Sequence, residues 1–192
     1  MGTAARGRAF AVGLATACAI AVAGCSADPD DQPTQATPSS PSPTDDQTDP
    51  RANQVTEPTL PADAEGGSIR SAKAFVGYYI DLLNYAMVTG DTKSFRAVGQ
   101  RNCGGCADYV DLFASTYDRG GFFKSRGWSL DRVLVGSRNG NQVQFTVTAT
   151  AAPITFRERT GGQLKRSERD PLDFSLVLEK GEPAWSVRDF FA

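Results

Sequence analysis

Cys103 and Cys106 are the residues whose type and spacing most directly suggest chemistry. The string Cys103-Gly104-Gly105-Cys106 precedes an amphipathic stretch, and a Cys-x-x-Cys pair at the start of a helix lowers the pKa of one thiol, as thiol–disulfide exchange requires. Exchange enzymes place the pair after the strand of a β-α-β unit, whereas here it stands between two expected helices. Two thiols are only half of a zinc site, and the chain has no histidine. The pair therefore favours a structural disulfide over a redox or zinc site.

The absence of histidine excludes Ser-His-Asp and Cys-His nucleophilic sites, so a hydrolase would need a pair of carboxylates. Several aspartates fall on expected helices, and the last three have the spacing of a solvated helix face: Asp81, Asp108, Asp111 and Asp118. The glycine pairs at 104–105 and 120–121 lack the lysine and the strand-to-helix context of a phosphate-binding loop. We expect no metal and no cofactor.

The first 25 residues contain an export signal. Arg6 and Arg8 precede an apolar run over residues 9–23, which reaches about 23 Å and is too short to cross the ~30 Å hydrocarbon core of a bilayer. The run closes on Val22-Ala23-Gly24-Cys25, which resembles the lipobox of bacterial lipoproteins. The resemblance implies that residues 1–24 are removed, that Cys25 is lipidated, and that the protein is anchored at the extracytoplasmic face of the cell membrane.

This location bears on the other cysteines and on the partners. Cys18 leaves with the signal and Cys25 carries lipid, so only Cys103 and Cys106 remain as thiols in the mature chain. Disulfides persist in oxidising compartments, and we expect these two to be bonded to each other. A protein outside the cytoplasm is not expected to bind nucleic acid.

Residues 25–65 are expected to form an acidic, disordered linker behind the lipidated cysteine. This stretch holds eight of the eleven prolines and almost no bulky apolar side chains, so it cannot bury enough surface to offset the entropy of ordering. Its net charge is −8, whereas residues 66–192 carry a net charge of +4. The near-neutral total therefore hides two oppositely charged parts, and residues 66–192 are expected to be the folded domain.

The domain opens with helical patterns. An amphipathic helix is expected from Ser71, and Gly90 ends it. Asp91 or Thr92 is placed to cap a short second helix. A third helix is expected over about residues 105–117, with its apolar residues on one side.

From Trp128 onward apolar and polar residues alternate, which is typical of half-buried strands. Turn signals at residues 139–140, 160–162 and 180–183 separate four such segments, which predicts a four-stranded antiparallel meander. Pro153 and Pro171 are expected nearly opposite each other in the middle hairpin. Because proline removes a ladder donor, they predict a bend or bulge, and the sheet is expected to curl around the helices.

N-terminal helices packed on a curved antiparallel sheet make the expected fold class α+β. This element order resembles the cone-shaped fold of the nuclear-transport-factor-2-like (cystatin-like) superfamily. Residues 67–117 resemble a family of actinobacterial lipoproteins of unknown function more closely, and that family implies an envelope location without an activity. The resemblance rests on the strings Ala72-Lys73-Ala74-Phe75-Val76-Gly77-Tyr78-Tyr79, Leu83-Asn84-Tyr85-Ala86, Thr89-Gly90-Asp91-Thr92 and Cys103-Gly104-Gly105-Cys106.

Large aromatic residues are available to line the mouth of such a cone. Rings with polar tips suit a pocket that is apolar inside and wet at its opening. The residues expected there are Tyr78, Tyr79, Tyr109, Phe113, Trp128 and Trp185, with Phe122 and Phe123 as further candidates. The same side chains would serve as plain core, because a domain of this size needs its aromatic residues for packing.

The middle hairpin carries an unusual density of charge. Its cations outnumber its acids by two: Arg157, Arg159, Lys165, Arg166 and Arg169 stand among Glu158, Glu168 and Asp170. Charge at exposed strands discourages edge-to-edge pairing, which is the simplest interpretation. Contact with anionic wall polymers or lipid headgroups is the alternative.

Together these features predict a non-enzymatic binding or protein-interaction module of the cell envelope. Its partner is expected to be a small apolar ligand or another envelope protein, in addition to the membrane that holds the anchor. The alternative is an enzyme that uses Asp and Tyr side chains in the cone cavity as acid and base. The lack of histidine and of paired carboxylates favours the first hypothesis.

Overall fold

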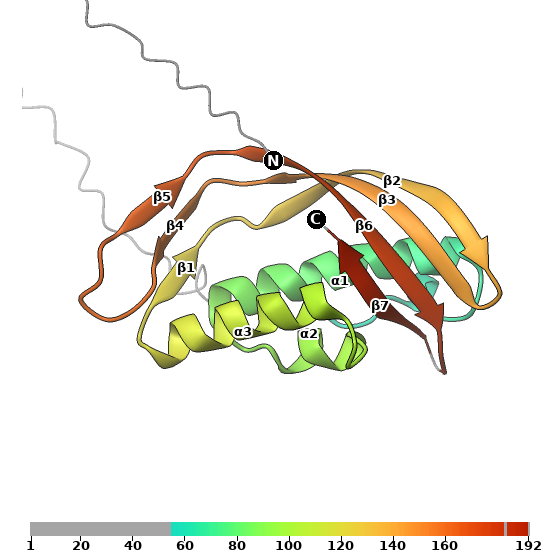
Figure 1. Cartoon of the computed structure of the whole chain (residues 1–192), viewed down its shortest axis with the longest axis horizontal. Helices are drawn as coiled ribbons and strands as arrows, with labels where there is room; N and C mark the ends of the chain where they lie inside the picture. The colour runs from blue at the N-terminus through green and yellow to red at the C-terminus, as the bar shows by residue number, and fades with distance from the viewer. Residues whose placement is uncertain (1–54, 183, 192) are drawn as a thin grey trace, which may run out of the picture. The chain divides into compact units, whose positions relative to one another are not determined.

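The computed structural model describes residues 55–182 and 184–191, in which three α-helices lie under two antiparallel sheets that follow one another along a bend (Figure 1). The expected signal peptide (1–24), Cys25 and most of the expected linker lie outside the described residues. The helical elements are η1 (Ala62–Ala64), α1 (Ile69–Thr89), α2 (Lys93–Val98) and α3 (Gly104–Asp118). The strands are β1 (Phe122–Lys124), β2 (Trp128–Asn139), β3 (Gln142–Ala151), β4 (Ile154–Arg157), β5 (Lys165–Ser167), β6 (Asp170–Lys180) and β7 (Trp185–Phe191).

The predicted helices are confirmed, and their ends follow from local hydrogen bonding. At the start of α1, the Ser71 N–H donates to the Ser68 hydroxyl and the Ser68 N–H donates to the Ser71 hydroxyl, both at 3.0 Å. The helix ends at Gly90, whose φ of 78° lies in the left-handed region that glycine adopts most easily. Of the two capping candidates for α2, Asp91 supplies the bond, since the Lys93 N–H donates to its carboxylate at 3.0 Å.

The predicted four-stranded antiparallel meander is also confirmed, with the order β2-β3-β6-β7. A second sheet, β1-β4-β5, was not predicted from the sequence. It arises because the three long strands are interrupted at one level, around residues 125–127, 152–153 and 168–169. The predicted bend therefore exists, but Pro171 pairs with Thr150 and the two prolines do not face each other. The hairpin turns between residues 160 and 161, which shifts the register from the one expected.

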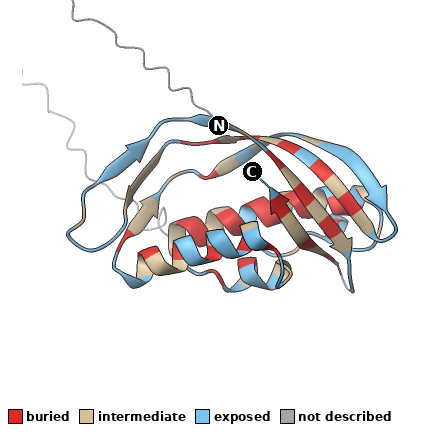
Figure 2. Cartoon of the chain, in the orientation of Figure 1, coloured by how far each residue is buried: buried red, intermediate tan, exposed pale blue. Residues whose placement is uncertain are grey.

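The core lies between the helices and the concave face of the sheet (Figure 2). Alternate residues of β3 and β6 point into it, because side chains of a strand face opposite sides of the sheet in turn. The largest fully buried side chains are those of Tyr79, Phe75, Phe95, Phe145, Leu82, Leu83, Leu176 and Leu178. The fold class predicted from the sequence, α+β with helices on a curved antiparallel sheet, is confirmed.

Part of the stretch assigned to the linker packs on the domain. Ala64 in η1 is fully buried and Leu60 contacts the core, while the Ser94 hydroxyl donates to the Glu57 carboxylate. The packed part of the chain therefore extends to the N-terminal side of Gly66. Within the described residues, none of the helices combines the length and the apolar character needed to span a membrane.

Candidate functional site

The interior of the cone is filled by its own side chains. Tyr79 is fully buried, with its ring centroid 5.0 Å from that of Phe95 and 6.4 Å from that of Phe190. Its hydroxyl donates to Sγ of Cys106 at 3.4 Å. Burial, and secondarily the nearby Tyr109, raises the pKa of the Tyr79 phenol, so this group stays neutral. It acts here as a packed core residue with one satisfied polar atom.

Four aromatic rings contact one another at the edge of the core, where Phe174 and Phe190 are buried and Tyr109 and Trp128 are half-buried. The Trp128 ring centroid lies 5.7 Å from that of Tyr109 and 5.8 Å from that of Phe174. The Phe190 ring centroid lies 5.1 Å from that of Phe174 and 5.5 Å from that of Tyr109. Each ring thus touches two others, and we call Tyr109, Trp128, Phe174 and Phe190 the aromatic quartet. Such contacts stabilise beyond their buried area by about 0.5–1.5 kcal/mol per pair. The quartet therefore extends from the buried core to the partly exposed surface.

Two shallow hollows flank the aromatic quartet on its solvent side. One, of about 440 Å³, is lined by Gly105, Asp108, Tyr109, Phe190 and Phe191. The other, of about 390 Å³, combines apolar and charged lining residues: Trp128, Ala151, Ile154, Leu172, Ser167, Glu168, Arg169 and Asp170. The ring contact between Tyr109 and Trp128 joins them. We call the surface formed by both hollows the mouth.

Exposed apolar side chains and an open strand edge adjoin the mouth. Phe191, at the end of β7, lines the first hollow and is 56% exposed. Leu112 lines neither hollow, but it lies one turn beyond Asp108 on the same face of α3 and is 46% exposed. Strand β7 pairs with β6 only at residues 175–180. Residues 170–174 therefore have no strand beside them on that side in the described part of the chain, and their backbone groups form an unpaired edge. This edge leads directly from the end of β7 toward the hollow that contains Trp128.

Gly105 sets the position of α3 against β7. A Cβ at this residue would lie 2.5 Å from the Phe190 carbonyl oxygen and 2.8 Å from its ring, so no larger residue fits without moving the backbone. This close approach brings Tyr109, one turn further along α3, onto the ring of Phe190. The glycine in the Cys-x-x-Cys turn thus has a packing role at the mouth.

The disulfide between Cys103 and Cys106 fixes the start of α3. The two sulfurs are bonded, and the Cys106 N–H donates to the sulfur of Cys103, which caps the helix. Both residues are buried, with exposed fractions of 1% and 4%. An exchange partner must bring a thiolate onto a sulfur, and this burial leaves little access for it. The arrangement fits a structural bridge.

Replacing both cysteines with alanine is expected to lower the free energy of unfolding by about 2 kcal/mol on the chain-entropy account of a short loop. Urea unfolding followed by circular dichroism measures the change, and the folded spectrum should be retained. Thiol labelling of the mature wild-type protein without reductant should find both cysteines blocked. Rapid labelling of either residue would contradict the structural role and favour exchange chemistry.

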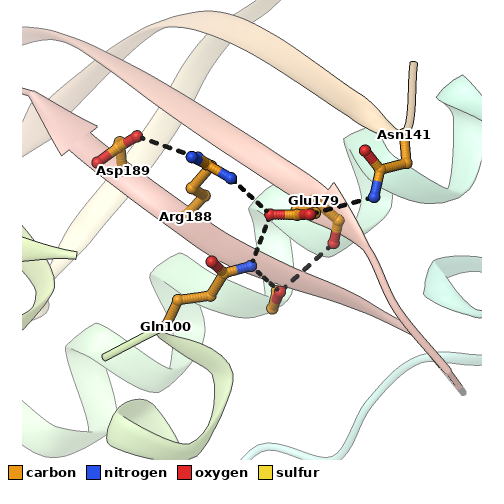
Figure 3. Close-up of polar contacts among 6 residues, drawn as sticks. Gln100, Asn141, Glu179, Arg188 and Asp189 are labelled. Carbon is orange, nitrogen blue, oxygen red and sulfur yellow. Dashed lines mark hydrogen bonds and ion pairs between the residues drawn. The ribbon is translucent and has the colours of Figure 1, made fainter. Parts of the chain in front are cut away.

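A polar network ties the loop before α3 to the β6–β7 hairpin (Figure 3). The Glu179 carboxylate accepts hydrogen bonds from Gln100, Arg188 and Asn141, each at 3.1 Å. Led by the Gln100 bond, these contacts hold the pKa of Glu179 below its ordinary value. The Gln100 N–H also donates to the Val187 carbonyl at 2.8 Å. Because β7 is held at this end, its other end presents Phe190 and Phe191 in a fixed place.

The structure places the six predicted pocket residues in three different surroundings. Tyr79, Phe113 and Trp185 are buried in the core, and the Trp185 indole N–H donates to the Ser71 hydroxyl at 3.3 Å. Tyr78 is half-buried against the ring of Phe75 at 5.9 Å, away from the mouth. Tyr109 and Trp128 are the two that line the hollows described above. The six residues do not surround one cavity, because the space expected for a ligand is occupied by packed rings.

The further candidates Phe122 and Phe123 point to opposite faces of the small sheet. Phe123 packs inward, with its ring 5.7 Å from both Phe113 and Phe156. Phe122 pairs with Arg157 on the outer face. Phe174, Phe190 and Leu172 were not predicted at the mouth. Alternation marks Phe174 and Leu172 as inward-facing, but no sequence signal shows that α3 brings Tyr109 against Trp128 and Phe190.

Comparison with known families gives one match over most of the chain. A family model described as "Family of unknown function (DUF6318)" matches residues 45–188. No curated protein matches the chain in sequence.

Several solved structures share part of the arrangement of helices and strands. The chain is similar to the intermembrane space region of the chloroplast protein ARC6, with 14% identity, coverage of 64% of this chain and 94% of that one, and a TM-score of 0.46. It is similar to a calcium/calmodulin-dependent protein kinase II association domain from Xanthomonas campestris, with 13% identity, coverage of 70% and 91%, and a TM-score of 0.41. It is also similar to a protein of the NTF2-like family from Streptomyces avermitilis, with 14% identity, coverage of 60% and 91%, and a TM-score of 0.39.

Proposed function

The chain belongs to the family of unknown function DUF6318, and we propose that it is a membrane-anchored lipoprotein whose domain binds an extended apolar segment of another cell-envelope protein at the mouth. The function is binding, without chemistry on the partner. The observation that carries the proposal is the aromatic quartet, whose half-buried members Tyr109 and Trp128 line hollows beside an unpaired strand edge.

The anchor is supported by the sequence alone. Arg6 and Arg8, the apolar run and the lipobox-like Val22-Ala23-Gly24-Cys25 are the signals for export and lipidation. Two acyl chains hold a protein at a bilayer far better than one, since each buried CH₂ adds about 0.8 kcal/mol. An actinobacterial envelope, as the resemblance of residues 67–117 implies, is the setting that we propose.

The shape of the mouth favours a protein segment over a small ligand. Enclosed ligand sites bury most of a small molecule, whereas the two hollows here are shallow and lie side by side. An added strand could pair with the backbone of residues 170–174 and continue the line of β7. Its alternate side chains would then meet Leu172 and the aromatic quartet, which gives affinity through the backbone and selectivity through the hollows.

The enzyme hypothesis receives less support from the same geometry. The tyrosine deepest in the cone is committed to Sγ of Cys106, and burial, followed by the charge of Asp108, raises the pKa of Tyr109. A tyrosine with a raised pKa is a poor base near neutral pH. We therefore favour binding as the function of the mouth.

Leu112→Glu tests the proposal against a matched control, Leu134→Glu. Both leucines are about half exposed, at 46% and 51%, but Leu134 lies on β2 and its pairing partner Thr146 faces away from the core. A charge placed in an apolar contact should weaken binding by at least about tenfold. We expect crosslinking in intact cells to recover the same envelope protein with wild type and with Leu134→Glu, and at least tenfold less of it with Leu112→Glu.

The melting temperatures of the two variants should stay close to that of wild type, because both sites are exposed. The proposal is wrong if Leu112→Glu recovers the partner as well as wild type does, or if both variants lose it equally.

A further inference from the structure

The outer face of the small sheet β1-β4-β5 collects positive charge. The strand register places five side chains on this face: Phe122, Lys124, Thr155, Arg157 and Arg166. The opposite face holds Phe123, which packs against Phe113 in the core, so the first set points outward. Three of the five outward residues are cations and none is an acid. We call these five residues the basic face.

The cations of the basic face surround an aromatic ring. Lys124 Nζ and Arg157 Cζ each lie 5.5 Å from the centroid of the Phe122 ring. Arg157 Nε is buried and has no hydrogen-bond partner among the described residues. By contrast, Lys165 on the inner face is paired with Glu158 at 2.6 Å. The charge of the basic face is thus not neutralised by carboxylates of its own strands.

Protection of strand edges does not account for this arrangement. Arg166 lies on β5 at the edge of the small sheet, where charge discourages pairing with another chain. Arg157, however, lies on β4, the central strand, which already has neighbours on both sides. An apolar side chain also projects nearby, since Leu164 in the turn between β4 and β5 is 45% exposed. Surfaces that contact a membrane interface typically combine cations with aromatic and aliphatic side chains, as this one does.

We propose that the basic face, with Leu164, docks on a bilayer that contains anionic lipids. Cations spread over one face of a sheet match a plane of negative charge, and Lys and Arg residues near such a surface each strengthen attachment. The proposal rests in part on the proposed anchor, because 29 residues separate Cys25 from Val55. Fully extended, that length reaches on the order of 100 Å, so the small sheet can lie on the membrane that holds the lipid.

The described chain begins where α1 meets the connection between β1 and β2. Val55 lines one hollow with residues of α1, among them Asn84 and Tyr85, and with residues 125–127. The length of the preceding segment, and not this starting point, is what allows the small sheet to reach the membrane. Docking through the outer face would leave the concave side free, and the mouth lies on that side.

The test uses the mature chain, residues 25–192, with Cys25→Ala and purified without lipid, so that neither acyl chains nor the export signal contributes to the outcome. Cosedimentation with vesicles that contain phosphatidylglycerol should show salt-sensitive binding, and vesicles of phosphatidylcholine alone should show little. Adding Lys124→Glu and Arg166→Glu should weaken the binding at least about tenfold. Arg132→Glu with Arg138→Glu, the same charge change on exposed positions of β2, should leave it nearly unchanged.

Three results would overturn the proposal. The first is no binding of the Cys25→Ala chain to anionic vesicles, and the second is equal binding to both kinds of vesicle. The third is an equal loss in both pairs of variants, since that would reflect net charge alone. A chain that binds soluble polyphosphate but not anionic vesicles would also overturn the proposal, because the proposed surface is a bilayer. The Leu112→Glu experiment is unaffected by any of them, so failure of docking and failure of the proposed function are distinguishable.

Discussion

Tyr79→Ala is expected to lower the free energy of unfolding by about 3–5 kcal/mol. The ring is fully buried between α1, α2 and β7, where it contacts the rings of Phe95 and Phe190. Its removal leaves a cavity that the close-packed surroundings can fill only in part. Urea unfolding measures the loss, and a domain of ordinary stability is expected to be partly unfolded at physiological temperature after this change.

Tyr79→Phe is the matched control. It keeps the ring and removes only the hydrogen bond to Sγ of Cys106, which is a weak acceptor, so we expect a change of about 1 kcal/mol or less. If Tyr79→Ala instead changed stability by less than about 1 kcal/mol, the ring would be lining an open pocket rather than filling the core. That outcome would restore the ligand-cavity hypothesis.

The second large effect is expected on localisation. We expect the native chain to stay with membranes through a wash in high salt, because acyl chains on Cys25 bind through apolar contact that salt does not weaken. The comparison variant carries Cys25→Ala, and a cleavable general secretory signal replaces its residues 1–24. We expect this variant in the medium after the same wash. Fractionation followed by immunoblotting measures both.

The wash separates lipid attachment from the proposed contact of the basic face, since salt screens the latter. Mass spectrometry of the mature N-terminal peptide provides the chemical control, because a diacylglyceryl group adds a defined mass to Cys25. Release of the native chain by salt alone, or an unmodified Cys25 at the mature N-terminus, would contradict the anchor.

Periodicity predicted the elements of the domain because each signal is local. Ser71 and Gly90 lie near the two ends of α1, and alternation over residues 142–148 and 172–178 marks strands of the meander. The division into two sheets was missed. It depends on three strand interruptions meeting at one level, and only Pro153 and Pro171 hinted at it. The division into two sheets depends on how strands far apart in sequence pair with one another. The pattern of a single strand carries no information about that pairing.

The candidate site was predicted less well than the fold, for a related reason. Tyr109 and Trp128 each line a hollow of the mouth, whereas Tyr79 and Trp185 are core residues. Composition shows that the chain has many aromatic rings. Whether a given ring lines a cavity or fills the core depends on its contacts with the other rings. Those contacts require the close approach of α3 to β7 at Gly105, and in a sequence a glycine between two cysteines is equally typical of a tight turn.

Site-resolved photocrosslinking in intact cells tests the mouth most directly. A photoreactive phenylalanine analogue at Leu112 should form a covalent adduct with one envelope protein, mapped to an extended apolar segment, and the adduct should be lost when Leu172 is replaced by arginine. The same analogue at Leu134, equally exposed on the outer face of β2, should give no such adduct. An adduct of equal yield at both positions, or no protein adduct at Leu112, would contradict binding at the mouth.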